Sequence, residues 1–167
     1  MESSGTLESI AEVGVALAGF GGIAAGLGYR ARGIWSPDDQ SRLILLATSG
    51  LTVVFACYLP STAHHLGSAA PWRAASALYF PFASSWLLGT AWFFRHGAPT
   101  GHSRIAALLV MLSLFGASGI LLAAALGWGA SRVSGLYLCA VLLGLFQSSI
   151  YFVRLLLTSF RTGTPAA

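Results

Sequence analysis

Charge is scarce in this sequence. Only 8% of its 167 residues are Asp, Glu, Lys or Arg, and 56% are hydrophobic, whereas about 25% of the residues of a soluble globular protein are charged. Lysine is absent, and all five acidic residues lie at or before Asp39. So few charged side chains could not cover the surface of a water-soluble fold. The composition therefore excludes a soluble globular domain and predicts a protein whose solvent is lipid.

Sequence motifs of catalysis are also missing. The chain contains no P-loop, no GxSxG, no HExxH and no CxxC. Its two cysteines, Cys57 and Cys139, are most simply small apolar side chains. Both fall toward the same ends of their helices, so a disulfide is geometrically conceivable, and the sequence leaves their pairing open. We expect a protein that is not an enzyme.

Four histidines raise the question of a metal or haem site. His64 and His65 are expected on one side of the membrane and His96 and His102 on the other, so no two histidines from different helices face each other at one depth. Neighbouring residues of a helix point about 100° apart, which makes His64 and His65 a poor chelating pair. We expect no metal and no cofactor.

The apolar residues gather in five blocks of about 18 to 25 residues, the length that an α-helix needs to cross a bilayer core of about 30 Å. Backbone groups in lipid must be satisfied within their own segment, so each block is a helix. The predicted fold class is all-α, a polytopic integral membrane protein in which a compact bundle of five transmembrane helices forms a single domain, 1–167, without a soluble domain. The helices are expected at about 10–29, 43–64, 72–94, 105–128 and 133–157.

The nine basic residues are all arginine, and they divide unequally between the two sides of this bundle. The side richer in arginine is cytoplasmic by the positive-inside rule, which puts the N-terminus outside and the C-terminus in the cytoplasm, in a plasma membrane or bacterial inner membrane. The arginines stand singly at helix ends, so we expect anionic lipid headgroups as partners, and no nucleic acid. The cytoplasmic arginines are Arg30, Arg32, Arg42, Arg95, Arg104, Arg154 and Arg161, and the outer ones are Arg73 and Arg132.

Small residues occupy every fourth position of the first block, at Gly14, Ala18, Gly22 and Gly26. Lipid supplies little hydrophobic drive between helices, so close approach of backbones through such a groove holds them together. We interpret this helix-packing groove as a contact inside the monomer. The alternative is a face for self-association.

Polar residues and a proline interrupt the third and fifth blocks. Pro81 should kink its helix and free one carbonyl group, which Ser84, Ser85 or a neighbouring helix could satisfy. Gln147 and Ser148 form the other polar patch. We expect these side chains to make hydrogen bonds between helices. The alternative is that they line a permeation path or a ligand site.

Titratable residues from several helices are expected to meet at the outer rim. Such a mixture can bind an anion or a headgroup, or gate access to the bundle, and it can equally consist of ordinary interfacial residues; we favour the second interpretation. The residues of this outer-rim cluster are Glu8, Glu12, His64, His65, Arg73 and Arg132.

The spacing of Ser9 and Glu12 fits a capping box, in which each side chain accepts a hydrogen bond from the other residue's amide. Ser9 is therefore expected to cap the first helix, which would begin at Ile10. Glu12 would then be a helix start, and would matter for activity only if it faced Arg73, Arg132 or His64.

Two hypotheses of function follow. The first is a non-catalytic multi-pass membrane component that acts by helix packing, with itself or with another membrane protein. The second is a small ion or solute transporter or channel, with a path beside the Pro81 kink and Gln147.

Overall fold

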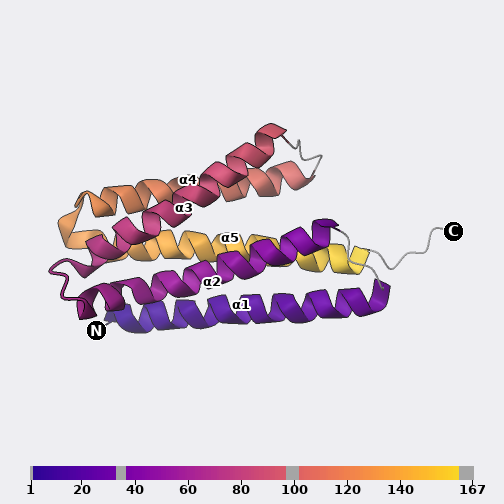
Figure 1. The fold of residues 1–167 in the computed structure, drawn as a ribbon, viewed down its shortest axis with the longest axis horizontal. Coiled ribbons are helices and arrows are strands. Elements are labelled where there is room, and N and C mark those ends of the chain that lie inside the picture. Colours follow the sequence, from indigo (N-terminus) through magenta and orange to yellow (C-terminus); the bar gives the residue numbers. More distant parts are fainter. Residues whose placement is uncertain (1, 33–36, 97–101, 162–167) are drawn as a thin grey trace.

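The structure is a computed structural model that describes residues 2–32, 37–96 and 102–161. The described residues form five long α-helices, which confirms the all-helical prediction (Figure 1). A short 3-10 helix, η1 (Ala130–Arg132), precedes the last of them. The α-helices are α1 (Glu2–Arg32), α2 (Pro37–His65), α3 (Pro71–His96), α4 (His102–Ala125) and α5 (Val133–Arg161).

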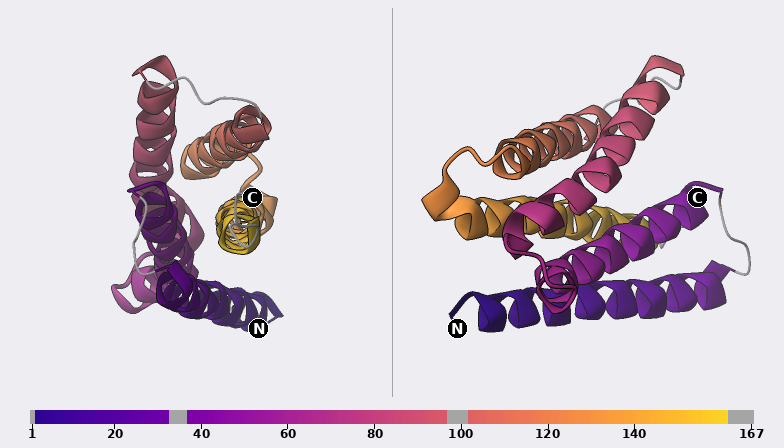
Figure 2. Two further views of the ribbon diagram at one scale, coloured as in Figure 1. Left: turned by 90° about the vertical axis from the view of Figure 1, so that its right-hand side faces the viewer. Right: turned by 60° about the vertical axis from the view of Figure 1, so that its left-hand side comes forward.

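The helices alternate in direction, so that the start of α1 and the end of α5 lie at opposite ends of the bundle (Figure 1). Proline is the first residue of both α2 and α3, a position at which its missing N–H costs no helical hydrogen bond. Helix α3 crosses the bundle obliquely, and its C-terminal half leans away from α1 and α2 (Figure 2).

Four of the helices have the length and composition to cross a membrane. The stretches that qualify are Gly5–Ala24, Leu43–His65, Ala107–Ala125 and Val133–Leu157. Helix α3 is long enough at 26 residues, but serine, tyrosine, tryptophan and proline are interspersed along it and make it less apolar. The structure therefore supports four spans by composition where the sequence predicted five.

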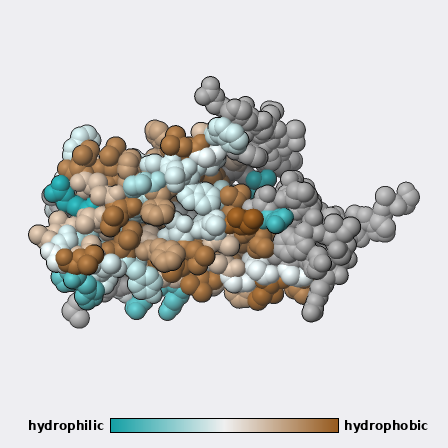
Figure 3. All heavy atoms as spheres, in the orientation of Figure 1, coloured by the Kyte–Doolittle hydropathy of each residue, from teal (hydrophilic) through white to brown (hydrophobic). Residues whose placement is uncertain are grey.

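The surface is apolar along all five helices. Large hydrophobic side chains are exposed on each, among them Phe20, Phe55, Leu88, Phe115 and Phe146. Figure 3 shows apolar side chains spread over much of the described surface that is in view. So many exposed large apolar side chains are unusual for a soluble monomer, which agrees with the lack of charge in the sequence.

The start of α1 differs from the prediction. The helix begins at Glu2, so Ser9 is an interior residue and not the cap, and its hydroxyl donates to the Gly5 carbonyl at 3.1 Å. The reason is burial, because Leu7 packs with Ile10 in the core between the helices and extends the buried stripe of α1 one turn before Ser9. Tertiary packing here overrides the local capping signal.

The end of α4 also differs from the prediction. Gly127 has a positive φ of 83°, and the Trp128 amide donates to the Ala123 carbonyl at 2.9 Å while the Gly127 amide bonds the carbonyl three residues before it. This is the pair of hydrogen bonds of a Schellman motif, which terminates a helix. Helix α4 therefore ends at Ala125, and Gly67 terminates α2 in the same way.

Substitution of Gly127 tests this helix end. We expect Gly127→Ala to lower the free energy of unfolding by about 1 to 2 kcal/mol, because a left-handed backbone is unfavourable for alanine and the added Cβ would lie 3.1 Å from the guanidinium carbon of Arg73. Unfolding in mixed micelles titrated with sodium dodecyl sulfate measures the change. Gly119→Ala is the control, since Gly119 is helical and has open space around it; equal effects of the two substitutions would contradict the assignment.

Candidate functional site

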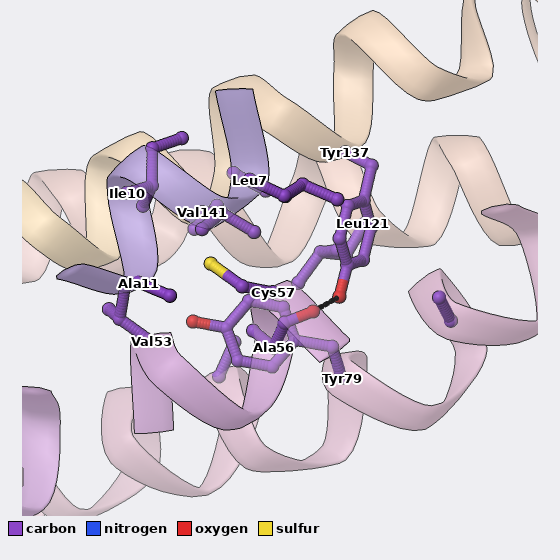
Figure 4. Packing of buried hydrophobic residues seen from close by; sticks show 14 residues of the cluster. Leu7, Ile10, Ala11, Val53, Ala56, Cys57, Tyr79, Leu121, Tyr137 and Val141 are labelled. Carbon is purple, nitrogen blue, oxygen red and sulfur yellow. Dashed lines mark hydrogen bonds between the residues drawn. The ribbon is translucent and has the colours of Figure 1, made fainter. Parts of the chain in front are cut away.

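The tightest polar contact between helices joins α2 to α5. Pro60 lies inside α2 and has no N–H to donate to the carbonyl four residues earlier. That carbonyl belongs to Ala56, and the Tyr137 hydroxyl of α5 donates to it at 2.6 Å (Figure 4). Tyr137 is fully buried. A side chain of α5 thus replaces the hydrogen bond that proline removes from α2.

Tyr137 also connects α5 to α3 through its ring. The ring meets Trp72 edge to face at a centroid distance of 5.9 Å, and Tyr79 at 6.2 Å. Such geometry is favourable for aromatic pairs beyond the area that they bury. Figure 4 shows the Tyr79 and Tyr137 rings on opposite sides of the Ala56 carbonyl, with Cys57 beside them. One tyrosine therefore holds three helices together near one end of the bundle.

A second polar contact joins the same two helices farther along. The Ser148 hydroxyl of α5 donates to the Ser49 hydroxyl of α2 at 3.0 Å, and Ser49 donates in turn to the Leu46 carbonyl at 3.1 Å. Both serines are buried. Ser148 takes part in a hydrogen bond between helices, as the sequence predicted for the in-span polar residues.

A small cavity of about 20 Å³ lies between these two contacts, at the junction of α2, α3, α4 and α5. Side chains of Ser49 and Thr52 face it from α2, and Tyr79 and Trp86 from α3. Gln147 is the polar side chain that α5 contributes. The remaining lining residues are small or apolar, namely Val53, Ala83, Leu114, Ala117 and Gly144.

Gln147 is 96% buried, since only 4% of it is exposed. Its amide nitrogen donates to the Tyr151 hydroxyl at the long distance of 3.4 Å, and its carbonyl oxygen accepts no hydrogen bond from the described residues. The hydroxyl of Tyr79 likewise has no hydrogen-bond partner in the described part of the chain. Both groups belong to residues that line the cavity, so the cavity holds unused hydrogen-bonding capacity.

Pro81 and the two serines that follow it are not among the described residues that line this cavity. Pro81 and Ser85 are exposed, Ser84 is half-buried, and the Ser85 hydroxyl donates to the Phe82 carbonyl at 2.8 Å. Neither serine is therefore seen to satisfy the carbonyl that Pro81 frees, that of Ala77. Of the predicted polar and kink residues, only Gln147 faces the cavity.

The predicted helix-packing groove divides into two halves. Gly14 and Ala18 face α2, where a Cβ placed on Gly50 would lie 3.2 Å from the Gly14 carbonyl oxygen and 3.4 Å from the Ala18 Cβ. Gly22 and Gly26 have nothing within 4 Å in the described structure. The first half is a contact inside the monomer, and the second half is an open face.

The alternating helices bring the outer-rim cluster to one end of the bundle (Figure 1), but no ion pair forms among its six members as the structure describes them. The exposed rings of His64 and His65 are 6.1 Å apart. The Arg73 guanidinium donates to the Ala125 carbonyl at 3.4 Å, which places a positive charge at the C-terminus of α4, where the helix dipole favours it. Glu8, Glu12 and Arg132 are exposed, and a ligand-binding or gating role for the cluster stays a prediction.

The two cysteines are free thiols, Cys57 buried in the core and Cys139 exposed. Four residues that shape the site were not singled out from the sequence: Ser49, Thr52, Tyr79 and Tyr137. The sequence did contain a signal for a donor such as Tyr137. Pro60 lies inside an apolar block, so the carbonyl four residues earlier lacks its helical hydrogen bond and needs another donor.

Comparison of the chain with protein families, with curated proteins and with solved structures finds no match.

Removal of the Tyr137 hydroxyl tests the link between α2 and α5. We expect Tyr137→Phe to lower the free energy of unfolding by about 1 to 3 kcal/mol, because the Ala56 carbonyl is left buried without a donor. Pro60→Ala returns an N–H to α2, so Tyr137→Phe should cost less in that background. Unfolding in mixed micelles measures both effects, and Tyr58→Phe at an exposed position is the control. An equal loss of unfolding free energy with and without Pro60→Ala would show that the Tyr137 hydroxyl does not replace the hydrogen bond that Pro60 removes.

Proposed function

We propose that the chain is a polytopic membrane protein whose five helices all cross the bilayer, with the N-terminus outside and the C-terminus in the cytoplasm of a plasma membrane or bacterial inner membrane. Four helices of spanning length and composition support this. Helix α3 must cross as well if they do, because it connects the end of α2 to the start of α4 at the opposite end of the bundle (Figure 1). Its 26 residues extend about 39 Å, which exceeds a bilayer core of about 30 Å.

The distribution of arginine supports the orientation and the lipid partner. Seven arginines belong to the end of the bundle at which α1 and α3 finish and α2 and α4 begin, and two belong to the other end. The arginine-rich end is cytoplasmic by the positive-inside rule. Anionic headgroups there are attracted to arginine at helix ends.

The molecular role that the geometry supports best is assembly, without catalysis. Helix α1 has two faces of small residues, of which one is already occupied by α2. The observation that carries the proposal is the second face, where a Cβ placed on Gly19, Gly22 or Gly26 would meet nothing within 4 Å in the described structure. The exposed side chains of Val15 and Ile23 border this face. In lipid, such a face allows two backbones to approach closely.

We propose a second copy of the chain as the occupant of this open face. A face of glycines flanked by aliphatic side chains is self-complementary, which is what a twofold symmetric contact requires. The alternative is another membrane protein, which would leave the purified chain monomeric.

Substitution on the two faces of α1 separates assembly from folding. We expect native mass spectrometry of the purified chain to report a dimer, and Gly22→Leu to report a folded monomer, because the open face is not used inside the subunit. The midpoint of thermal unfolding of Gly22→Leu should match that of the unsubstituted chain diluted until it is monomeric. Gly50→Leu should instead lower the midpoint, since Gly50 lies against the backbone of α1.

Gly89→Leu is the matched control, because Gly89 is exposed on α3 with nothing within 4 Å in the described structure. It should change neither the subunit number nor the midpoint. A Gly22→Leu protein as dimeric as the unsubstituted chain would refute the assignment of this face.

A small transporter or channel is the second candidate function, and the buried amide of Gln147 at the cavity is the observation that favours it. A space of about 20 Å³ admits about one water molecule, so a path would require the helices to move apart.

This candidate predicts ion or solute flux in proteoliposomes, abolished by Gln147→Leu and retained by Ser85→Ala on the exposed side of α3. The leading proposal predicts no protein-dependent flux. Flux that survives Gln147→Leu would contradict a path through this cavity.

A further inference from the structure

Two residues that line the cavity, Gln147 and Tyr79, are buried as a whole, and their polar groups have hydrogen-bonding capacity that the described residues leave unused. Gln147 is 4% exposed and Tyr79 is 6% exposed. Gln147 offers two N–H groups and a carbonyl oxygen, of which one N–H makes a single long bond to Tyr151. Buried polar groups without protein partners are usually satisfied by an ordered water, which makes about three hydrogen bonds.

The two groups are close enough for one molecule to join them. A Cβ placed on Gly144 would lie 3.0 Å from the Tyr79 hydroxyl oxygen, so this hydroxyl rests against α5 at Gly144. Gln147 follows three residues later, and side chains at that spacing are neighbours about 5 to 6 Å apart on one helix face. Two hydrogen bonds of about 2.7 to 3.2 Å each span such a separation.

The volume of the cavity indicates the size of the molecule that it can hold. Its volume of about 20 Å³ exceeds the roughly 10 to 15 Å³ that one water needs. Trp86, Ala83 and Leu114 are bulky or apolar residues of α3 and α4 in its lining, so the space matches one small molecule.

The residues that line the cavity also indicate that the bound molecule is neutral. Asp, Glu, Lys, Arg and His are all absent from the described residues that line the cavity. An ion without a charged partner at such a place would be strongly disfavoured, whereas hydroxyl and carboxamide groups bind neutral hydrogen-bonding molecules.

We infer that this cavity, which lies between the helices, is a binding site for one water molecule that bridges the Gln147 carboxamide of α5 to the Tyr79 hydroxyl of α3. The water adds a polar connection between α5 and α3, whereas the direct hydrogen bonds described above join α5 to α2. This inference does not rest on the dimer or on a transport function.

A crystal structure of the whole chain in a lipidic phase, at a resolution that shows ordered water, tests the site directly. We expect an isolated density peak within hydrogen-bonding distance of both Gln147 and Tyr79, and no such peak in Gln147→Met, whose apolar side chain has a similar shape. A direct hydrogen bond between the Tyr79 hydroxyl and a protein group, or a cavity without a peak in the unsubstituted chain, would overturn the proposal.

A double-mutant cycle gives an independent measurement in case crystals of one variant are not obtained. Tyr79→Phe and Gln147→Met should together shift the midpoint of unfolding by less than the sum of their separate shifts, because the first substitution already releases the bridging water. Tyr79→Phe combined with Ser113→Ala is the control and should be additive, since the Ser113 hydroxyl bonds its own helix. Additivity of both pairs would also overturn the proposal.

Discussion

The constraint on which the rest of the bundle depends is that a carbonyl group surrounded by apolar side chains must find a donor. Pro60 breaks this condition inside α2, and the Tyr137 hydroxyl of α5 restores it at 2.6 Å. The same ring packs edge to face on Trp72 and Tyr79. The hydrogen bond that Pro60 removes from α2 thereby constrains the neighbouring helices. The Tyr137 hydroxyl reaches the Ala56 carbonyl only when α5 packs closely on α2, and the Tyr137 ring then packs on α3.

Close approach of helices supplies the remaining cohesion. Glycine on both α1 and α2 lets the two backbones meet at Gly14 and Gly50, and the serine pair joins α2 to α5. Helix α1 thus packs by shape, whereas α5 also packs by hydrogen bonds. This division explains why the cavity forms among α2 to α5, away from α1, and why α1 is left with an open face of glycines that a second subunit can use.

The sequence allowed the helices to be predicted more fully than the contacts between them. Apolar blocks locate the five helices because each block is about as long as a membrane-spanning helix, but hydropathy does not give the residue at which a helix ends. The Schellman motif at Gly127 ends α4 at Ala125, before the predicted end. The capping spacing at Ser9 misled because Leu7 belongs to a buried cluster whose other members come mostly from helices far away in the sequence. The role of Gln147 as a buried polar group could be predicted, since glutamine is rare in such a block. Its neighbours Tyr79 and Ser49 could not, because their meeting depends on the angles at which α2 and α3 cross α5.

The most direct test of this account is the vibrational frequency of a single carbonyl. Isotope-edited infrared spectroscopy of the chain in lipid, with a ¹³C=¹⁸O label at Ala56, reports whether that carbonyl accepts a hydrogen bond. The account predicts a lower frequency in the unsubstituted chain than in Tyr137→Phe, and a return toward the lower value when Pro60→Ala is added. The same frequency with and without the Tyr137 hydroxyl would contradict it.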